Sequence, residues 1–228
     1  MISLIVPEKE ENYRNFLLKK GVKLPSFNET VQIIYSKLLN YAKSRKSQGF
    51  RHGMFFVIGG YDIISKCSYQ LNKDSKLYKD WKCLIDAKED LNEFFLESEG
   101  KEGAFLVTKS GFLYAEQQHI ITHHQYHNIV YAKLGGYGNL NDILKIDGGD
   151  AGTKTSTAML LTKISDCCTI TLGSCSGNEP YEERKLRMFK GGTMMKCDIV
   201  RDGNTDELSK GLRYFLTSKK KYSSLSFS

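Results

Sequence analysis

The 228-residue sequence contains no apolar run close to the roughly 20 residues that a membrane-spanning helix needs. This excludes an integral membrane protein built from helices. Only 3 prolines occur and 11% of the residues are aromatic, which excludes disorder over most of the chain. Residues 1–11 hold a short apolar patch with no basic segment before it, so a secretory signal peptide is not expected. These absences predict a globular, cytoplasmic protein.

Cysteine pairs with C-x-x-C spacing are also missing, although the chain has 6 cysteines. Cys167 and Cys168 are adjacent in a β-like run, so their side chains should point to opposite faces of a strand. We expect reduced thiols that pack as small hydrophobic side chains. Neither a zinc site nor a disulfide framework is predicted.

Positive charge exceeds negative charge, with 33 Lys and Arg against 26 Asp and Glu and a formal net charge of +7. Residues 30–61 contain no acidic residue, and their basic residues are Lys37, Lys43, Arg45, Lys46 and Arg51. Basic stretches attract phosphate groups, so nucleotides and nucleic acids are both candidate partners. Nucleic acid is not favoured on this ground alone, because such a charge also occurs in proteins that never bind it.

Hydrophobic patterning predicts an α/β fold, a mixed sheet with helices on its faces and an N-terminal helical extension. Apolar runs at 54–58 and 167–172 indicate buried strands, and glycine turns at 110–111 and 191–192 indicate two hairpins. Further strands are expected at 63–71 and 128–134. Helices are expected at 7–20, 28–49 (with Asn28 as its cap), 91–99, 141–146, 155–164 and 205–216, and Tyr78 and Trp81 are expected on a charged helix. The predicted units are the extension 1–49, a core domain 50–200, and a helix with a polar tail 201–228.

The residue types best suited to phosphate binding are concentrated at 146–158, Ile-Asp-Gly-Gly-Asp-Ala-Gly-Thr-Lys-Thr-Ser-Thr-Ala. Glycines lead into a predicted helix start, where free N–H groups form a natural anion site. One lysine and four hydroxyl residues add donors there: Thr153, Lys154, Thr155, Ser156 and Thr157. A plain Ser/Thr-capped helix start is the alternative. A Walker A loop is not predicted, because Thr153 stands where that motif has the glycine before its lysine.

Three blocks, in this order, resemble the diadenylate cyclase domain family. Residues 52–59, His-Gly-Met-Phe-Phe-Val-Ile-Gly, are similar to its first core strand, and Glu102-Gly103-Ala104 resembles its Asp-Gly-Ala motif. Residues 152–158 resemble its Gly-Thr-Arg-His-Arg-Thr-Ala loop, and the resemblance extends over residues 50–192. It implies a mixed sheet with helices on its faces. It also implies two domains, each binding one ATP, that face each other and form cyclic di-AMP with the help of a metal.

By position, the resemblance gives Glu102 the place of the metal-linked catalytic Asp, with Mg²⁺ or Mn²⁺ as the metal. The implied nucleotide-binding residues are Gly103, Ala104, Gly152, Thr153, Lys154, Thr155, Ser156 and Thr157. The loop departs from the family pattern, because Lys154, Thr155 and Ser156 replace Arg, His and Arg. Point-charge and hydroxyl contacts thereby replace bidentate phosphate contacts. We therefore expect a degenerate sensor or regulatory module that binds a purine nucleotide or a cyclic (di)nucleotide.

Two alternatives remain open. One is an active, divergent diadenylate cyclase or nucleotidyltransferase that uses Glu102 and a divalent metal to make a cyclic dinucleotide from ATP. The other is a basic interaction protein that uses residues 30–61 to bind nucleic acid or an acidic partner. A homodimer or higher homo-oligomer is also open. The histidines at 119, 123, 124 and 127 are expected to be solvated or packed rather than bound to a metal.

Overall fold

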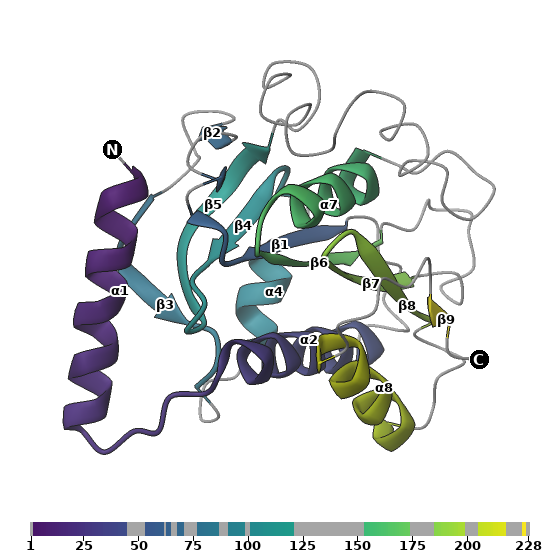
Figure 1. Cartoon of the computed structure of the whole chain (residues 1–228), viewed down its shortest axis with the longest axis horizontal. Coiled ribbons are helices and arrows are strands. Elements are labelled where there is room, and N and C mark those ends of the chain that lie inside the picture. The colour runs from purple at the N-terminus through teal and green to yellow at the C-terminus, as the bar shows by residue number, and fades with distance from the viewer. Residues whose placement is uncertain are drawn as a thin grey trace.

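The computed structural model describes residues 2–44, 53–61, 63–64, 68–70, 77–86, 91–98, 101–120, 153–173, 185–198, 205–217 and 225–226. The helices in these ranges are α1 (Ile2–Lys19), α2 (Phe27–Ser44), α4 (Asn92–Ser98), α7 (Thr153–Ile164) and α8 (Thr205–Thr217). The strands are β1 (Met54–Ile58), β2 (Ser68–Gln70), β3 (Leu77–Cys83), β4 (Ala104–Val107), β5 (Phe112–Ile120), β6 (Cys168–Leu172), β7 (Lys185–Lys190), β8 (Thr193–Asp198) and β9 (Leu225–Ser226). The predicted α/β fold with a mixed sheet is confirmed (Figure 1).

All strands of the described ranges join one sheet, in the order β2-β5-β4-β1-β6-β7-β8-β9, and β3 also pairs with β5. The central strand β1 runs parallel to β4 and antiparallel to β6. Strands β6, β7 and β8 continue as an antiparallel meander. Both predicted hairpins are therefore present, β4–β5 and β7–β8.

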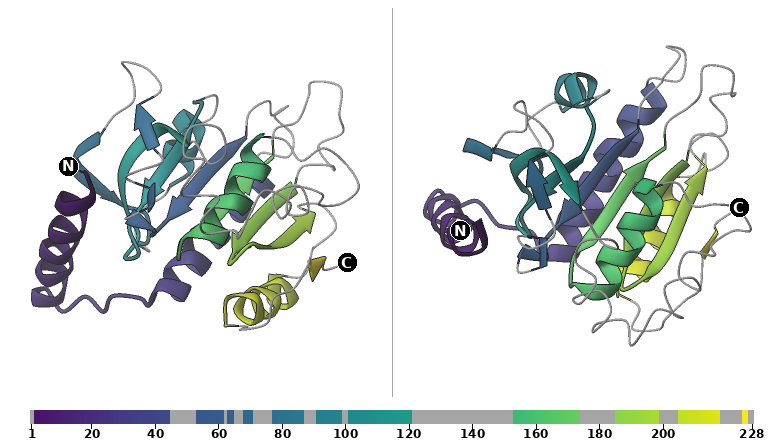
Figure 2. Two further views of the ribbon diagram at one scale, coloured as in Figure 1. Left: turned by 45° about the horizontal axis from the view of Figure 1, so that its top comes forward. Right: turned by 90° about the horizontal axis from the view of Figure 1, so that it is seen from above.

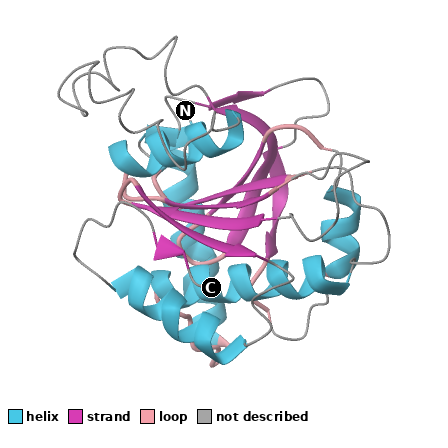
Figure 3. Cartoon of the chain, turned by 90° about the vertical axis from the view of Figure 1, so that its right-hand side faces the viewer, coloured by secondary structure: helices cyan, strands magenta, loops and turns pink. Residues whose placement is uncertain are grey.

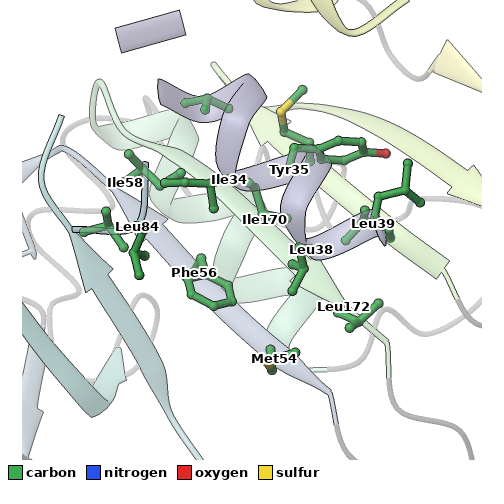
Figure 4. Close-up of a cluster of buried hydrophobic side chains, with 14 of the residues drawn as sticks. Ile34, Tyr35, Leu38, Leu39, Met54, Phe56, Ile58, Leu84, Ile170 and Leu172 are labelled. Carbon is green, nitrogen blue, oxygen red and sulfur yellow. The ribbon is translucent and has the colours of Figure 1, made fainter. Parts of the chain in front are cut away.

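Helices cover both faces of this sheet, as Figures 2 and 3 show from different sides. Successive side chains of a strand point to opposite faces of the sheet, so the apolar side chains of β1 fill a core on each face. Met54, Phe56 and Ile58 enter a core shared with α2, α4 and α8, whereas Phe55 and Val57 enter a second core beneath α7. Figure 4 shows the first of these cores, in which Phe56 is fully buried.

Helix α2 belongs to the first core, although it lies in the predicted N-terminal extension. Ile34, Tyr35 and Leu38 are buried in the same cluster as the side chains of β1 and β6. No helix in the described part of the chain has the length and hydrophobicity that crossing a membrane requires. The boundaries expected at residues 49 and 200 stay predictions.

The start of α2 differs from the expectation, because Ser26 rather than Asn28 caps it. The backbone N–H of Ser26 donates to Glu29 Oε2 at 2.7 Å, and the N–H of Glu29 donates to Ser26 Oγ at 3.3 Å. This reciprocal pair is a capping box. The side chain of Asn28 instead accepts a hydrogen bond from Lys190 on β7.

Two further expectations about local structure were wrong. Tyr78 and Trp81 lie on β3 rather than on a helix, and Trp81 stacks on Tyr13 of α1 with ring centroids 5.5 Å apart. The expected strand 63–71 is reduced to β2, because Ile63 and Ile64 form a helical turn closed onto the carbonyl of Gly60. The strand and helix expected at 128–134 and 141–146 lie outside the described residues.

The thiols that the structure describes, Cys83, Cys167 and Cys168, form no disulfide. Cys167 and Cys168 are buried in the two different cores, as expected for adjacent residues at the start of a strand. Burial raises the pKa of the Cys167 thiol to about 12, and it raises the pKa of Cys168 as well. Both thiols therefore stay protonated at neutral pH.

Candidate functional site

The candidate site lies at the amino ends of the parallel strands β1 and β4. Their register pairs Phe56 with Phe105, so it sets Gly53, just before β1, beside Glu102, just before β4. Glu102 is exposed at this edge. The first and second blocks of the predicted site therefore lie next to each other.

Helix α7 brings the third block to the same edge. It lies across β6 and β7, where Thr169 Oγ1 donates to the carbonyl of Ala158 and the Gly192 N–H donates to Thr162 Oγ1. Its last turn is thus near the β7–β8 turn, and its first turn points back toward the start of β1. There Lys154 Nζ donates a hydrogen bond to the carbonyl of Gly53 at 3.0 Å.

Two opposing influences act on the Lys154 ammonium. The Lys154 side chain is exposed overall, but partial burial of its ammonium lowers the pKa of Lys154, and the nearby negative charge of Glu102 raises it. Burial is the larger influence, so the pKa of Lys154 lies below that of an ordinary lysine. The structure therefore brings together the two charged residues that the resemblance assigned to the site.

Gly103 has a packing role that the sequence did not reveal. Its φ is +91°, and a Cβ atom there would lie 2.7 Å from the backbone carbon of Gln117 on β5. Gln117 itself has a φ of 54°, at an irregularity in the β4–β5 pairing. The close approach of two backbones thus requires glycine here. A role of Gly103 toward a nucleotide stays a prediction.

The other predicted residues differ in how accessible they are. Ala104 is fully buried at the start of β4, and only 6% of Thr157 is exposed, so neither offers much surface to a ligand. Thr155 is half-buried. Gly152 lies outside the described residues, as do the side chains of Thr153 and Ser156, whose backbones form the first turn of α7.

Among the described residues, no three His, Cys, Asp or Glu side chains come together as a metal site. Glu102 is therefore not part of a cluster of carboxylates there. Mg²⁺ often binds through one or two carboxylates and the phosphates of a nucleotide. Glu102 fits a metal held in that way. His119 lies on β5, and the other three histidines of the sequence prediction are outside the described residues.

Two residues of this region carried no signal in the local sequence. Thr171 on β6 and Arg187 on β7 are paired across the sheet, on the face that α7 covers. Only long-range strand pairing places them there.

The basic stretch at 30–61 is described only in part. Lys37 donates to the carbonyl of Asp86, and Lys43 lies in the last turn of α2. Arg45, Lys46 and Arg51 lie outside the described residues.

Comparison with known proteins gives no family for this chain. No family model matches it, and no curated protein matches it. A hypothetical membrane spanning protein from Bacillus cereus is similar in structure, with 14% identity and a TM-score of 0.43 over 73% of this chain. The match spans 62% of the length of that protein. A double mutant of DacA from Staphylococcus aureus is 12% identical with a TM-score of 0.39, covering 81% of this chain and 96% of that one.

Proposed function

We propose that this protein binds a purine nucleotide or a cyclic dinucleotide at the amino end of α7, as a sensor or regulatory module. The observation that carries the proposal is the position of Lys154, whose ammonium is held against the Gly53 carbonyl beside Glu102. A neutral carbonyl partner leaves the positive charge of the ammonium available to an anion. The free N–H groups of the first helical turn add to the same anion site.

A carboxylate beside this cation favours a nucleotide over inorganic phosphate. Lys154 and the helix terminus suit phosphate oxygens, whereas the carboxylate of Glu102 is suited to accept a hydrogen bond from a ribose hydroxyl. A ligand with both groups would satisfy both ends of the site. Binding of this kind needs fewer positioned residues than catalysis does, because no group has to stabilise a transition state.

The proposal is tested by calorimetric titration of the whole chain with ATP and with cyclic di-AMP, without added metal. The Lys154→Met variant should bind at least about tenfold more weakly, since a charge-assisted contact is lost. Lys163→Met is the matched control, because Lys163 is an exposed lysine in the last turn of the same helix. Equal affinity in the Lys154 variant, or no binding of either ligand by the unchanged protein, would contradict the proposal.

The exposed Glu102 beside Lys154 favours one second candidate, a divergent cyclase that uses a divalent metal. Each of two ATP molecules would lose pyrophosphate as the 3′-hydroxyl of the other attacks its α-phosphate. A metal bound by Glu102 and the phosphates would supply charge neutralisation. Mass spectrometry after incubation with ATP and Mn²⁺ decides between the two candidates. A cyclic dinucleotide that disappears in Glu102→Gln supports the enzyme, and binding without product supports the sensor.

A further inference from the structure

We propose that Arg187 on β7 is a second phosphate-binding residue of this site, with the buried hydroxyl of Thr171 between it and the first turn of α7. The inference rests on the proposed function and extends it. It specifies that the preferred ligand carries more than one phosphate group, because the site then has two cationic contacts rather than one.

Strand register places Arg187 and Thr171 on the side of the sheet that α7 covers. Phe55 on β1 pairs with Thr171 on β6, and Thr171 pairs with Arg187 on β7. Directly paired residues project from the same face of a sheet. Phe55 belongs to the core beneath α7, whereas Leu186 and Met188, the neighbours of Arg187, belong to the opposite core.

The position of Thr171 along the helix follows from its neighbour Thr169, which donates to the carbonyl of Ala158. Helix α7 and strand β6 run in opposite directions, since three residues connect them. A strand rises about 3.3 Å per residue and a helix about 1.5 Å. Moving two residues forward along β6 therefore covers about the same distance as moving four residues back along α7. Thr171 thus lies level with the first helical turn and with Lys154.

The hydroxyl of Thr171 is an independent sign of a ligand at this point. Thr171 is 3% exposed, and its Oγ1 has no hydrogen-bond partner within the described ranges. A buried hydroxyl without a partner is costly, and most are satisfied in native proteins. Its position under the first turn of α7 suits a donor to a phosphate oxygen.

Arg187 is within reach of a ligand that starts at Lys154. Neighbouring strands are about 4.8 Å apart, so Arg187 on β7 lies about 10 Å across the sheet from Phe55 on β1. A lysine and an arginine side chain can cover that width together with a chain of two or three phosphates. Arg187 is half-buried and already has an interaction of its own. A guanidinium carries five N–H donors, so it can keep that interaction and bind one phosphate group through two parallel hydrogen bonds.

The test measures the affinity of the whole chain for AMP, ADP and ATP by calorimetry. Arg187→Gln should weaken ATP binding at least about tenfold while changing AMP binding by less than about twofold. Arg187→Lys should restore part of the loss for ATP. Arg213→Gln on the exposed side of α8 is the matched control and should leave all three affinities unchanged.

Thr171→Val provides a second readout that does not depend on charge. The variant keeps the shape of the side chain and removes a hydroxyl that has no partner, so its thermal midpoint should not fall. Its affinity for ATP should nevertheless fall several-fold. A normal ratio of ATP to AMP affinity in both Arg187→Gln and Thr171→Val would overturn the inference, as would an equal loss for AMP and ATP.

The same titrations separate this inference from the proposed function. If the unchanged protein binds none of the three nucleotides, the proposed function fails, and the inference fails with it. If the protein binds them and loses binding in Lys154→Met but keeps its phosphate preference in Arg187→Gln, only the inference is wrong. If Arg187→Gln does not fold, the ATP to AMP ratio of Thr171→Val decides.

Discussion

The two ends of the parallel pair β1 and β4 use their charged residues in different ways. At the carboxyl end, the buried carboxylate of Glu10 accepts hydrogen bonds from the Tyr61 hydroxyl and from the Ser110 N–H, and Lys109 forms an ion pair with Asp166. At the amino end, Glu102 is exposed and the Lys154 ammonium is held by a neutral carbonyl. Lys101 at the amino end is also paired, with the buried Glu116 on β5. The charges that remain available to a ligand are therefore those of Glu102 and Lys154 at the amino end.

This difference matters because ligands of open α/β sheets usually bind at the carboxyl ends of the strands. Here α1 occupies that end, with Glu10 at the tip of the β4–β5 hairpin and Tyr13 stacked on Trp81. The helix thereby uses the usual binding position for stability. The amino end, which the sequence motifs had indicated, is therefore the better candidate for function.

Glu10→Ala, at the carboxyl end, should cause the largest loss of stability. The substitution leaves the Tyr61 hydroxyl and the Ser110 N–H without their buried acceptor, so the free energy of unfolding should fall by about 2–4 kcal/mol. Chemical denaturation monitored by Trp81 fluorescence measures it. Glu11→Ala is the matched control, because Glu11 is the exposed neighbour on the same helix and should change stability by less than about 0.5 kcal/mol. Equal effects of the two variants would contradict the paired role of Glu10.

Gly103→Ala, at the amino end, should cause the next largest loss of stability. A Cβ atom at a φ of +91° and 2.7 Å from the Gln117 backbone requires strain or movement of β5. We expect a loss of about 2–3 kcal/mol in the free energy of unfolding. Gly191→Ala is the control, since it has a φ of +58° but no atom within 4 Å of the added Cβ. It should cost about 1 kcal/mol. A smaller loss of stability for Gly103→Ala than for Gly191→Ala would show that the close approach of the two backbones does not require glycine at position 103.

A smaller effect should appear in the pH dependence of stability, through Cys167 at the carboxyl end. The unfolded chain releases the thiol proton near pH 9, whereas the folded chain retains it until its pKa of about 12. Between these values the unfolded state binds fewer protons, so the free energy of unfolding falls as pH rises. The expected slope is about 1 kcal/mol per pH unit for each such thiol. Cys167→Ala should be less steep between pH 9 and 10, and an identical slope would contradict the assignment.

The sequence predicted the elements whose signals are local. Glycine turns marked both hairpins, and the apolar run at 54–58 marked the central strand. It did not predict β3, because the charged run around Trp81 becomes a strand only through its pairing with β5. The role of Glu10 was equally hidden, since its partners Tyr61 and Ser110 are 51 and 100 residues away.

The candidate site was predictable in its residue types and not in its geometry. The motifs identified Glu102 and Lys154, but the contact of Lys154 with Gly53 joins residues 101 positions apart. Thr171 and Arg187 had no motif around them, and only the register of β1, β6 and β7 places them beside the predicted residues. The packing requirement at Gly103 also depends on β5.

The most direct test of a ligand site at the amino end measures the free energy of unfolding and the ATP affinity of the same Lys154→Met protein. We expect a free energy of unfolding within about 1 kcal/mol of that of the unchanged protein, because only one hydrogen bond to a carbonyl is lost. We expect at the same time an affinity for ATP that is at least about tenfold weaker. A loss of stability comparable to that of Glu10→Ala, with unchanged affinity for ATP, would contradict a ligand site here. It would show that Lys154 stabilises the fold at the amino end, as Glu10 does at the carboxyl end.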